Sequence, residues 1–316
     1  MKAVVTGGAG FIGSHIVEKL LASGHAVTVL DNFSSGKKEN LSFVSGSAGG
    51  EDRYTLIEGD IRDPDTCLGA CEGAEAVFHQ AALRSVPKSM ETPEEYNAVN
   101  IDGTLNMLKA AREHKVKRFV FASSSSVYGD TDQFPEKEDM YPLLISPYAL
   151  SKLAGEFYCR IFNENFGVET VALRYFNVFG PRQALDDEYA VVIPKFTHCI
   201  LNDQQPPIFG NGEQSRDFTY VANVVRANLL AASVNGVQGR VFNVANGSDV
   251  TILELVEKLN KIIGTHIEPQ FLPVRPGDVF KTLADVSALR NDLGLTEPVL
   301  FDEGLERTVE FFRSTE

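Results

Sequence analysis

The stretch Thr6-Gly7-Gly8-Ala9-Gly10-Phe11-Ile12-Gly13 joins two segments of different pattern near the start of the chain. Met1 to Val5 predicts a short buried strand, and the apolar spacing that follows the glycines predicts a helix. A glycine-rich turn between a strand and a helix suits the pyrophosphate of a dinucleotide. Glycine lets the backbone approach the phosphates, and the helix N-terminus offers free N–H groups. The stretch therefore predicts a dinucleotide site and an α/β fold.

The glycines fit two spacings, Gly8, Gly10 and Gly13 or Gly7, Gly10 and Gly13. Either match is weak alone, because many glycine-rich stretches are only tight turns. The context strengthens both, since a second apolar run ends in Asp31, 18 residues after Gly13. A carboxylate that binds the adenosine ribose is expected at that distance. It would repel a 2′-phosphate, so we predict NAD as cofactor.

The composition is that of an ordinary globular protein, with 316 residues, 43% of them hydrophobic and 23% charged. This length allows one large domain or two modest ones. The net charge of -14 disfavours nucleic acid and anionic membranes as partners. No apolar run approaches the roughly 18 residues of a membrane span, and no signal peptide precedes the first strand. We therefore expect a cytoplasmic protein.

The four cysteines show no metal-binding spacing. Cys67 and Cys71 lie four residues apart, which is a helical spacing, and Cys159 and Cys199 stand alone. Buried free thiols are the default for such residues, and they fit a reducing compartment. The six histidines form no metal-binding motif either, so we expect no metal.

Strand and helix patterns alternate up to about residue 175. This alternation predicts a doubly wound, largely parallel sheet covered by helices on both faces. Thr92-Pro93-Glu94-Glu95 predicts a helix start with a capping box, and that helix is expected to run to about His114. A second long helix is expected from Ser146 to Gly167. The expected strands are 1–5, 26–30, 54–58, 74–79, 118–122 and 169–174.

Proline and glycine interrupt the chain after Tyr175, which predicts a smaller, irregular α/β lobe. We expect residues 1–176 and 213–245 to form the dinucleotide-binding domain, and 177–212 and 246–316 the second lobe. The elements expected in this half are strands 216–221 and 240–244 and helices 223–233, 251–263 and 304–313, with a turn at 275–278.

Tyr148 and Lys152 lie four residues apart on the second predicted helix, so they share one face. Tyrosine is a poor base at its reference pKa of about 10. A nearby ammonium and the positive nicotinamide of an oxidised cofactor would lower that pKa. A serine at the end of an adjacent strand would share the proton of a substrate hydroxyl. Together with the glycine turn, this pattern predicts hydride transfer.

Four stretches together resemble the extended short-chain dehydrogenase/reductases that act on nucleotide sugars. They are the glycine turn, Ser123-Ser-Ser-Ser-Val-Tyr-Gly129, Tyr148-x-x-x-Lys152 and Arg174-Tyr-Phe-Asn-Val-Phe-Gly-Pro-Arg182. The resemblance covers essentially the whole chain. The branch it points to is the UDP-sugar 4-epimerases, and within it those acting on UDP-N-acetylglucosamine. The stretches that suggest this branch are His79-Gln-Ala-Ala-Leu-Arg-Ser-Val-Pro-Lys-Ser89 and Tyr189-Ala-Val-Val-Ile-Pro-Lys-Phe196.

The resemblance implies a Rossmann fold, bound NAD, reversible 4-epimerisation of UDP-hexoses through a 4-keto intermediate, and a homodimer. It also implies a cofactor role for a set of matching residues. The glycine turn would hold the pyrophosphate, and Asp60 would accept from adenine unless it only caps the next turn. The set is Gly7, Gly10, Phe11, Ile12, Gly13, Asp31, Asn32, Phe33, Ser34, Ser35, Gly36, Asp60, Ile61, Gln80, Ala81, Ala82, Asn100, Ser124, Tyr148, Lys152, Tyr175 and Phe176.

The same resemblance implies the substrate site. Ser124 matches the serine that bonds the reacting hydroxyl, with a register that leaves Ser125 and Ser126 open. The uridine would lie against Asn177, the 190–196 segment and Phe209, and two arginines would grip the diphosphate. The implied residues are Arg84, Ser85, Ser124, Ser125, Ser126, Tyr148, Asn177, Ala190, Val191, Val192, Lys195, Phe196, Phe209, Arg216, Arg275, Asp278 and Thr282.

Thr282 matches the family position that bounds the sugar pocket. A small side chain there would admit an N-acetyl group at C2 of the sugar, unless Phe280 intrudes instead. The sequence leaves three rival functions open. A 4,6-dehydratase would want carboxylates near Ser125 and Ser126, and a glucuronate epimerase or decarboxylase would want a cation such as Arg84. A non-catalytic NAD-binding regulator is the third.

Overall fold

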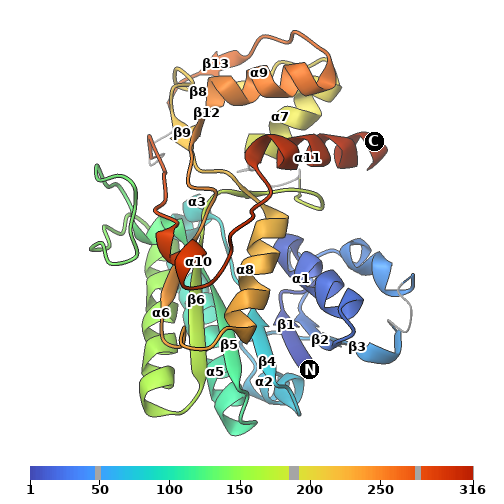
Figure 1. Cartoon of the computed structure of the whole chain (residues 1–316), viewed down its shortest axis with the longest axis vertical. Coiled ribbons are helices and arrows are strands. Elements are labelled where there is room, and N and C mark those ends of the chain that lie inside the picture. The colour runs from blue at the N-terminus through green and yellow to red at the C-terminus, as the bar shows by residue number, and fades with distance from the viewer. Residues whose placement is uncertain (47–50, 185–191, 275–278, 316) are drawn as a thin grey trace.

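The computed structural model describes residues 1–46, 51–184, 192–274 and 279–315. A parallel sheet with flanking helices fills the lower part of Figure 1, and a smaller lobe lies above it. Seven strands of the described chain form the sheet, in the order β11-β6-β5-β4-β1-β2-β3. Their bounds are β1 Lys2–Thr6, β2 Ala26–Asp31, β3 Tyr54–Glu58, β4 Ala76–His79, β5 Arg118–Ser124, β6 Glu169–Tyr175 and β11 Val241–Val244. The predicted doubly wound α/β fold is confirmed.

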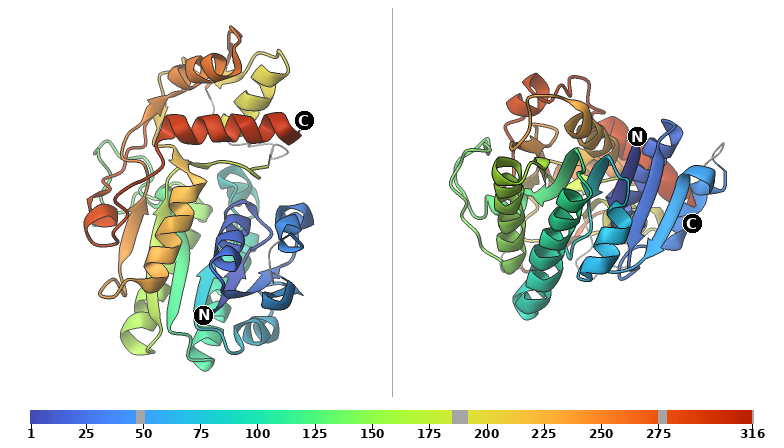
Figure 2. Two further views of the ribbon diagram at one scale, coloured as in Figure 1. Left: turned by 45° about the vertical axis from the view of Figure 1, so that its right-hand side comes forward. Right: turned by 90° about the horizontal axis from the view of Figure 1, so that it is seen from below.

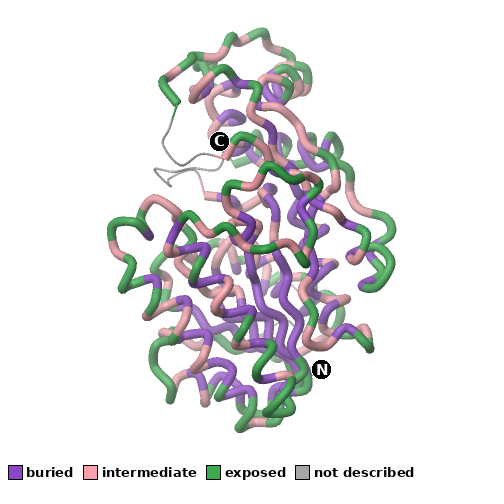
Figure 3. Tube along the Cα trace, turned by 90° about the vertical axis from the view of Figure 1, so that its left-hand side faces the viewer, coloured by how far each residue is buried: buried purple, intermediate pink, exposed green. Residues whose placement is uncertain are grey.

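Helices cover both faces of this sheet (Figure 2). One face packs against the apolar sides of α1 (Phe11–Ala22) and α8 (Val221–Ser233). The other packs against α2 (Pro64–Cys71), α5 (Gly103–Glu113) and α6 (Pro147–Asn165). Each helix buries one stripe because its apolar residues recur at helical spacing. Figure 3 shows the strands as a buried centre beneath these partly exposed helices.

The second lobe has a core of its own around Phe179, Phe196, Phe218 and Phe301. Within the described residues, three helices and three pairs of short strands enclose it. The helices are α7 (Val192–Leu201), α9 (Ile252–Ile263) and α11 (Phe301–Thr315). The strand pairs are β7 (Val178–Phe179) with β10 (Thr219–Tyr220), β8 (Pro207–Phe209) with β13 (Gln270–Leu272), and β9 (Ser215–Arg216) with β12 (Val250–Thr251).

The continuous strand expected at 216–221 is wrong. β9 ends at Arg216 and β10 begins at Thr219, and Asp217 between them is fully buried. Its carboxylate accepts backbone N–H groups from Asn246, Gly247 and Ala284. These bonds turn the chain inward and break the strand in two.

The capping box at Thr92 is also wrong. The Thr92 hydroxyl donates to the carbonyl of Lys88, in the short preceding helix α3 (Val86–Glu91), and the side chain caps no backbone N–H. The expected helix continues as α4 (Pro93–Tyr96), a π-helical segment η3 (Asn97–Asp102) and then α5. In a π-helical segment the hydrogen bonds join residues i and i+5, so its side chains point in other directions than they would in a continuous α-helix.

The division of the chain into two lobes at the predicted boundaries stays a prediction. The short helix α10 (Ser287–Asn291) does not follow those boundaries. Val286, Leu289 and Leu293 belong to the same buried cluster as α1 and α8, although they lie in the range assigned to the second lobe. Cys67 and Cys71 are both buried on α2, as their spacing predicts. In the described part of the chain, no helix is both long and apolar enough to cross a bilayer.

Candidate active site

The carboxyl ends of the central strands open on a cavity of about 1100 Å³. Its wall starts at the glycine turn after β1 and extends along the ends of β2, β4, β5 and β6. Asn177, Arg182 and Phe312, from segments beyond the sheet, also line it. Open parallel sheets bind their ligands at this edge. The volume is slightly above the usual range of roughly 300–1,000 Å³ for one small molecule, which suits a dinucleotide beside a second ligand.

The glycine turn fits a pyrophosphate. Gly7 has a φ of +64°, and a Cβ there would lie 2.8 Å from the backbone nitrogen of Ala81. A Cβ on Gly13 would collide with the carbonyl oxygen of Gly7. Among the described residues no side chain caps α1, whose N-cap is Gly10, and Phe11 and Ile12 of its first turn line the cavity. These residues leave the helix N-terminus free to bind an anion.

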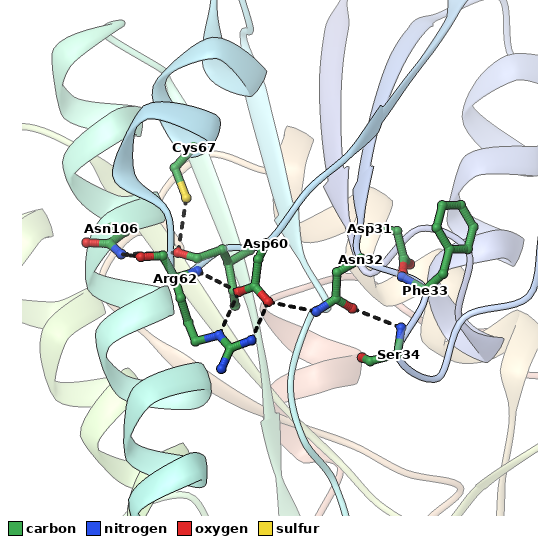
Figure 4. Close-up of polar contacts among 9 residues, drawn as sticks. Asp31, Asn32, Phe33, Ser34, Asp60, Arg62, Cys67 and Asn106 are labelled. Atoms are coloured by element: carbon green, nitrogen blue, oxygen red, sulfur yellow. Dashed lines mark hydrogen bonds and ion pairs between the residues drawn. The ribbon is translucent and has the colours of Figure 1, made fainter.

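Two carboxylates, Asp31 and Asp60, lie at the part of the cavity wall where the adenosine was predicted (Figure 4). Asp31 accepts backbone N–H groups from Ala9 and Phe33, at 2.9 and 2.8 Å, and burial raises its pKa. Asp60 accepts from Asn32 at 2.8 Å and from the Arg62 side chain, whose hydrogen bonds hold the pKa of Asp60 at about 2.

The cap of α2 is Asp63, so Asp60 does not fill the alternative role of helix cap. Asp60 instead accepts the backbone N–H of Arg62, two residues further along the chain. Asp60 itself lines the cavity. Ile61 also lines the cavity, and its carbonyl accepts from Cys67 and Asn106. Both predicted adenine-side residues therefore lie on the wall.

The backbone from Gln80 to Leu83 forms the next part of the wall. The Tyr175 hydroxyl donates to Gln80 Oε1 at 3.1 Å, and both residues line the cavity. Asn100 is buried behind this loop, where its amide bonds both the N–H and the carbonyl of Leu83. Asn100 therefore fixes the backbone of Leu83 from behind, and it is not among the described residues that line the cavity.

Tyr148, Lys152 and Ser124 come together at the inner end of the cavity. Tyr148 and Lys152 lie on α6, with Lys152 Nζ 5.9 Å from the centre of the Tyr148 ring. Lys152 Nζ donates to the carbonyl of Ala122 at 2.8 Å, which ties α6 to β5. Ser124 ends β5, and its Oγ accepts the N–H of Ser126 at 3.1 Å. Of Ser124, Ser125 and Ser126, Ser124 is the one that lines the cavity.

Burial dominates the electrostatics of these groups. It raises the pKa of Tyr148, while hydrogen bonding with Ser124 and the charge of Arg84 act in the opposite direction. It lowers the pKa of Lys152 to about 8. The sequence predicted that the ammonium of Lys152 lowers the pKa of Tyr148. In the protein without cofactor the net shift of the Tyr148 pKa is instead upward. The charge of Arg84 acts to lower that pKa, and the positive charge of an oxidised nicotinamide would add to this effect.

Several predicted site residues lie elsewhere among the described segments. Phe176 is fully buried against Tyr128, and Phe196 is in the core of the second lobe. Arg216 donates to the carbonyls of Ser215 and Phe280. The predicted residues that do not line the cavity in the described chain are Phe33, Gly36, Asn100, Ser125, Ser126, Phe176, Val192, Lys195, Phe196, Phe209, Arg216 and Thr282. Ala190, Val191, Arg275 and Asp278 lie outside the described residues.

Thr282 lies one layer behind the wall. It is buried, its hydroxyl donates to Asn177 Oδ1 at 3.0 Å, and it accepts the N–H of Asp217 at 3.1 Å. Asn177 itself lines the cavity with a φ of +28°, a conformation that few residues other than glycine adopt. The amide nitrogen of Asn177 is then the part left to donate to a ligand.

Sequence reasoning missed Arg182 as a wall residue. Its guanidinium donates to Ser14 and pairs with Glu18, both on α1, so it fastens the segment after β7 over the start of that helix. The residue stands in the quoted Arg174–Arg182 stretch, so the motif contained it. Only the fold brings it to the cofactor end of the cavity.

Comparison with known proteins agrees with this geometry. The sequence profile of the NAD dependent epimerase/dehydratase family matches residues 3–245. The chain belongs to that family. Its α/β fold and its dependence on NAD are those predicted from the glycine turn, the alternation of strands and helices, and Asp31. The residues of the cavity wall fit NAD, because Asp31 accepts the N–H of Ala9 in the glycine turn, so the predicted ribose carboxylate lies directly beside the predicted pyrophosphate turn.

Several family members match along their whole length. A UDP-N-acetylglucosamine 4-epimerase from Methanobrevibacter ruminantium, solved with UDP-N-acetylmuramic acid, is 43% identical, with a TM-score of 0.93, and covers 100% of this chain and 99% of its own. A UDP-glucose 4-epimerase from Thermotoga maritima, solved with UDP-glucose, is 40% identical with a TM-score of 0.92 over 100% and 99%. A UDP-glucose 4-epimerase of Mycolicibacterium smegmatis is 39% identical over 99% of both chains.

Proposed function

We propose that this protein is an NAD-dependent enzyme that interconverts the C4 epimers of UDP-hexoses. The observation that carries the proposal is the placement of Tyr148, Lys152 and Ser124 in one cavity with the glycine turn. The family relatives that act as UDP-glucose and UDP-N-acetylglucosamine 4-epimerases support it. Reversible epimerisation suits a cavity in which cofactor and sugar share one wall.

The residues of the chain divide the chemistry among them. Tyr148, as tyrosinate, removes the proton of the sugar 4-hydroxyl and later returns it, and Ser124 bonds the same oxygen. Lys152 keeps α6 against β5 and contributes positive charge beside the tyrosine. NAD would be held by the glycine turn and Asp31, and it would supply the reversible hydride chemistry that the sugar C4 needs. Arg84 and Asn177 line the cavity, where they bind and orient the sugar nucleotide.

A nucleotide-sugar 4,6-dehydratase is the nearest alternative, since a dTDP-glucose 4,6-dehydratase from Streptomyces niveus is 33% identical over 99% of this chain and 93% of its own. Expelling the 6-hydroxyl needs an acid and a base near the sugar. Ser125 and Ser126 stand where that family carries carboxylates. Incubation with a panel of UDP- and dTDP-sugars, with the products separated by chromatography, tests the assignment. Epimers without loss of water support it, and a 4-keto-6-deoxy product contradicts it.

The substrate range tests the role of Thr282. We expect the enzyme to accept UDP-glucose and UDP-galactose and, at least equally well, their N-acetylated forms. Thr282 lies directly behind Asn177, so the added ring of Thr282→Tyr would have to enter the cavity past that residue. There it would take the space of a group that only the N-acetylated sugars carry, so the variant should selectively lose turnover of those sugars. The measurement is kcat/KM for the four sugars.

Thr282→Val is the matched control, since it deletes the hydrogen bond to Asn177 without adding bulk. It should lower kcat/KM for both substrate classes to a similar degree. If Thr282→Tyr loses both classes equally, Thr282 does not control the choice. No turnover of UDP-N-acetylglucosamine by the native enzyme would contradict the substrate range.

We also propose that the enzyme is a cytoplasmic homodimer paired through α5 and α6. Leu150, Phe157 and Ile161 form a stripe on α6, and their exposed fractions are 51%, 55% and 44%. A stripe of large apolar side chains is typical of an interaction surface. Leu108 on α5 is fully buried in the sheet core, so it does not contribute to such a surface. Leu105 and Leu153 are partly buried beside the cores.

The dimer is tested by light scattering. We expect a dimeric mass for the native protein and a monomeric mass for Phe157→Glu, because the charge would be buried in the interface. Phe271→Glu is the control, since Phe271 on β13 is 56% exposed and lies in the other lobe. A monomeric native protein in dilute solution would contradict the proposal.

A further inference from the structure

His79 is a buried polar residue at the end of β4 that the catalytic scheme does not use. It is 1% exposed, and its ring lies 5.6 Å from the ring of Phe119 and 6.0 Å from that of Phe121. Its Nδ1 lies 2.8 Å from Thr6 Oγ1 and its Nε2 lies 3.0 Å from Thr104 Oγ1. Burial and the charge of Lys152 lower the pKa of His79 to about 3, so the ring is neutral.

The neighbours of His79 allow one arrangement of protons. Thr104 donates its single hydroxyl proton to the carbonyl of Asn100 at 2.6 Å, so it accepts from His79 Nε2. Nδ1 of the neutral ring is then bare and accepts the hydroxyl proton of Thr6. Thr6 Oγ1 in turn accepts the N–H of Ala81 at 3.1 Å. The ring therefore carries its proton on Nε2.

The chain of hydrogen bonds continues to the catalytic helix. Asn100 Nδ2 donates to Ser151 Oγ at 2.9 Å, and Ser151 donates to the carbonyl of Tyr148 at 2.7 Å. The rest of the Asn100 amide holds the N–H and the carbonyl of Leu83. Each hydroxyl in this path, on Thr6, Thr104 and Ser151, donates its single proton to one acceptor. Reversing any member would leave a buried donor or acceptor unpaired, which destabilises the fold.

We propose that His79, as the neutral Nε2–H tautomer, is a positioning residue that fixes the cofactor wall against the catalytic helix. One end of its chain holds Ala81, which lines the cavity. The other end holds Leu83 and the first turn of α6, which carries Tyr148. The chain crosses the strand ends from β1 to α6, so it couples the glycine turn to the general base.

The test compares Thr104→Val with Thr170→Val in the NAD-loaded enzyme. Thr104→Val deletes the acceptor of His79, whereas Thr170 is an equally buried threonine on β6 whose hydroxyl bonds Cys159 and stands outside the chain. We expect Thr104→Val to release labelled NAD roughly tenfold faster and to lower kcat roughly tenfold, as the loss of about one buried hydrogen bond predicts. KM for the UDP-sugar should stay within about threefold.

The tautomer gives a readout that a loss of stability would not move. In the ¹⁵N spectrum of histidine-labelled enzyme, His79 should keep a bare Nδ1 and a protonated Nε2 from about pH 5 to pH 8. Thr104→Val should alter that signal and Thr170→Val should not. A second pair of variants, His79→Gln and His79→Phe, should rank in that order in NAD retention, since the glutamine amide still reaches toward Thr104 and phenylalanine makes neither bond.

Two results would overturn the proposal. One is a proton on Nδ1 of His79 in the native enzyme. The other is equal NAD release and equal kcat for Thr104→Val and Thr170→Val. The kcat readout rests on the proposed epimerase activity, whereas NAD release and the tautomer do not. If no UDP-sugar is epimerised and NAD release still separates the two threonine variants, the positioning role stands and the proposed function falls.

Discussion

Tyr148→Phe should lower kcat by roughly 10²- to 10⁴-fold or more, which is the usual contribution of a general acid–base group. The ring is retained, so its packing against Tyr96, with the ring centres 6.4 Å apart, is expected to survive. NAD and UDP-sugar should bind within about tenfold of the native affinity. The measurements are steady-state epimerisation and calorimetric titration of both ligands.

Tyr158→Phe is the control for this variant, because Tyr158 lies on the same helix and packs against the sheet core, away from the cavity. It should keep nearly native kcat. Because burial raises the pKa of Tyr148, the tyrosinate fraction and the rate should rise with pH, and Tyr148→Phe should remove that rise. Near-normal epimerisation by Tyr148→Phe would disprove the assignment of the base.

Gly13→Ala should abolish measurable NAD binding. The new Cβ would collide with the carbonyl oxygen of Gly7 and would lie 2.9 Å from Gly8 Cα, and both are backbone atoms that cannot rotate away. The turn must open to accept the methyl group, which displaces the N–H groups that face the pyrophosphate. We expect the purified variant to carry no NAD and its melting temperature not to rise when NAD is added.

Gly69→Ala is the matched control for the glycine turn. Gly69 lies in α2, and a Cβ there would meet nothing within 4 Å. The change should leave NAD binding intact and stabilise the fold by up to about 1 kcal/mol, because alanine favours the helix. Native NAD affinity in Gly13→Ala would show that the turn does not hold the pyrophosphate.

The sequence by itself determined the features that depend on local spacing. Each of these features can be recognised within a short segment of the chain. They are the glycine turn, the distance from it to Asp31, the apolar pattern of the buried strands, and the four-residue separation of Tyr148 and Lys152. Each follows from a repeat of 2 or 3.6 residues or from a backbone that only glycine allows. These features predicted the fold class, the cofactor and the catalytic helix before any tertiary contact was known.

Tertiary structure decided the features that join distant segments. Thr6 and His79 are 73 positions apart and meet because β1 and β4 are neighbours in the sheet. Asn100 lies behind the cofactor wall and not on it. The buried carboxylate of Asp217 breaks a predicted strand by accepting N–H groups from segments 29 to 67 positions away. Such bonds form only after the strand order is set, and no local period encodes that order.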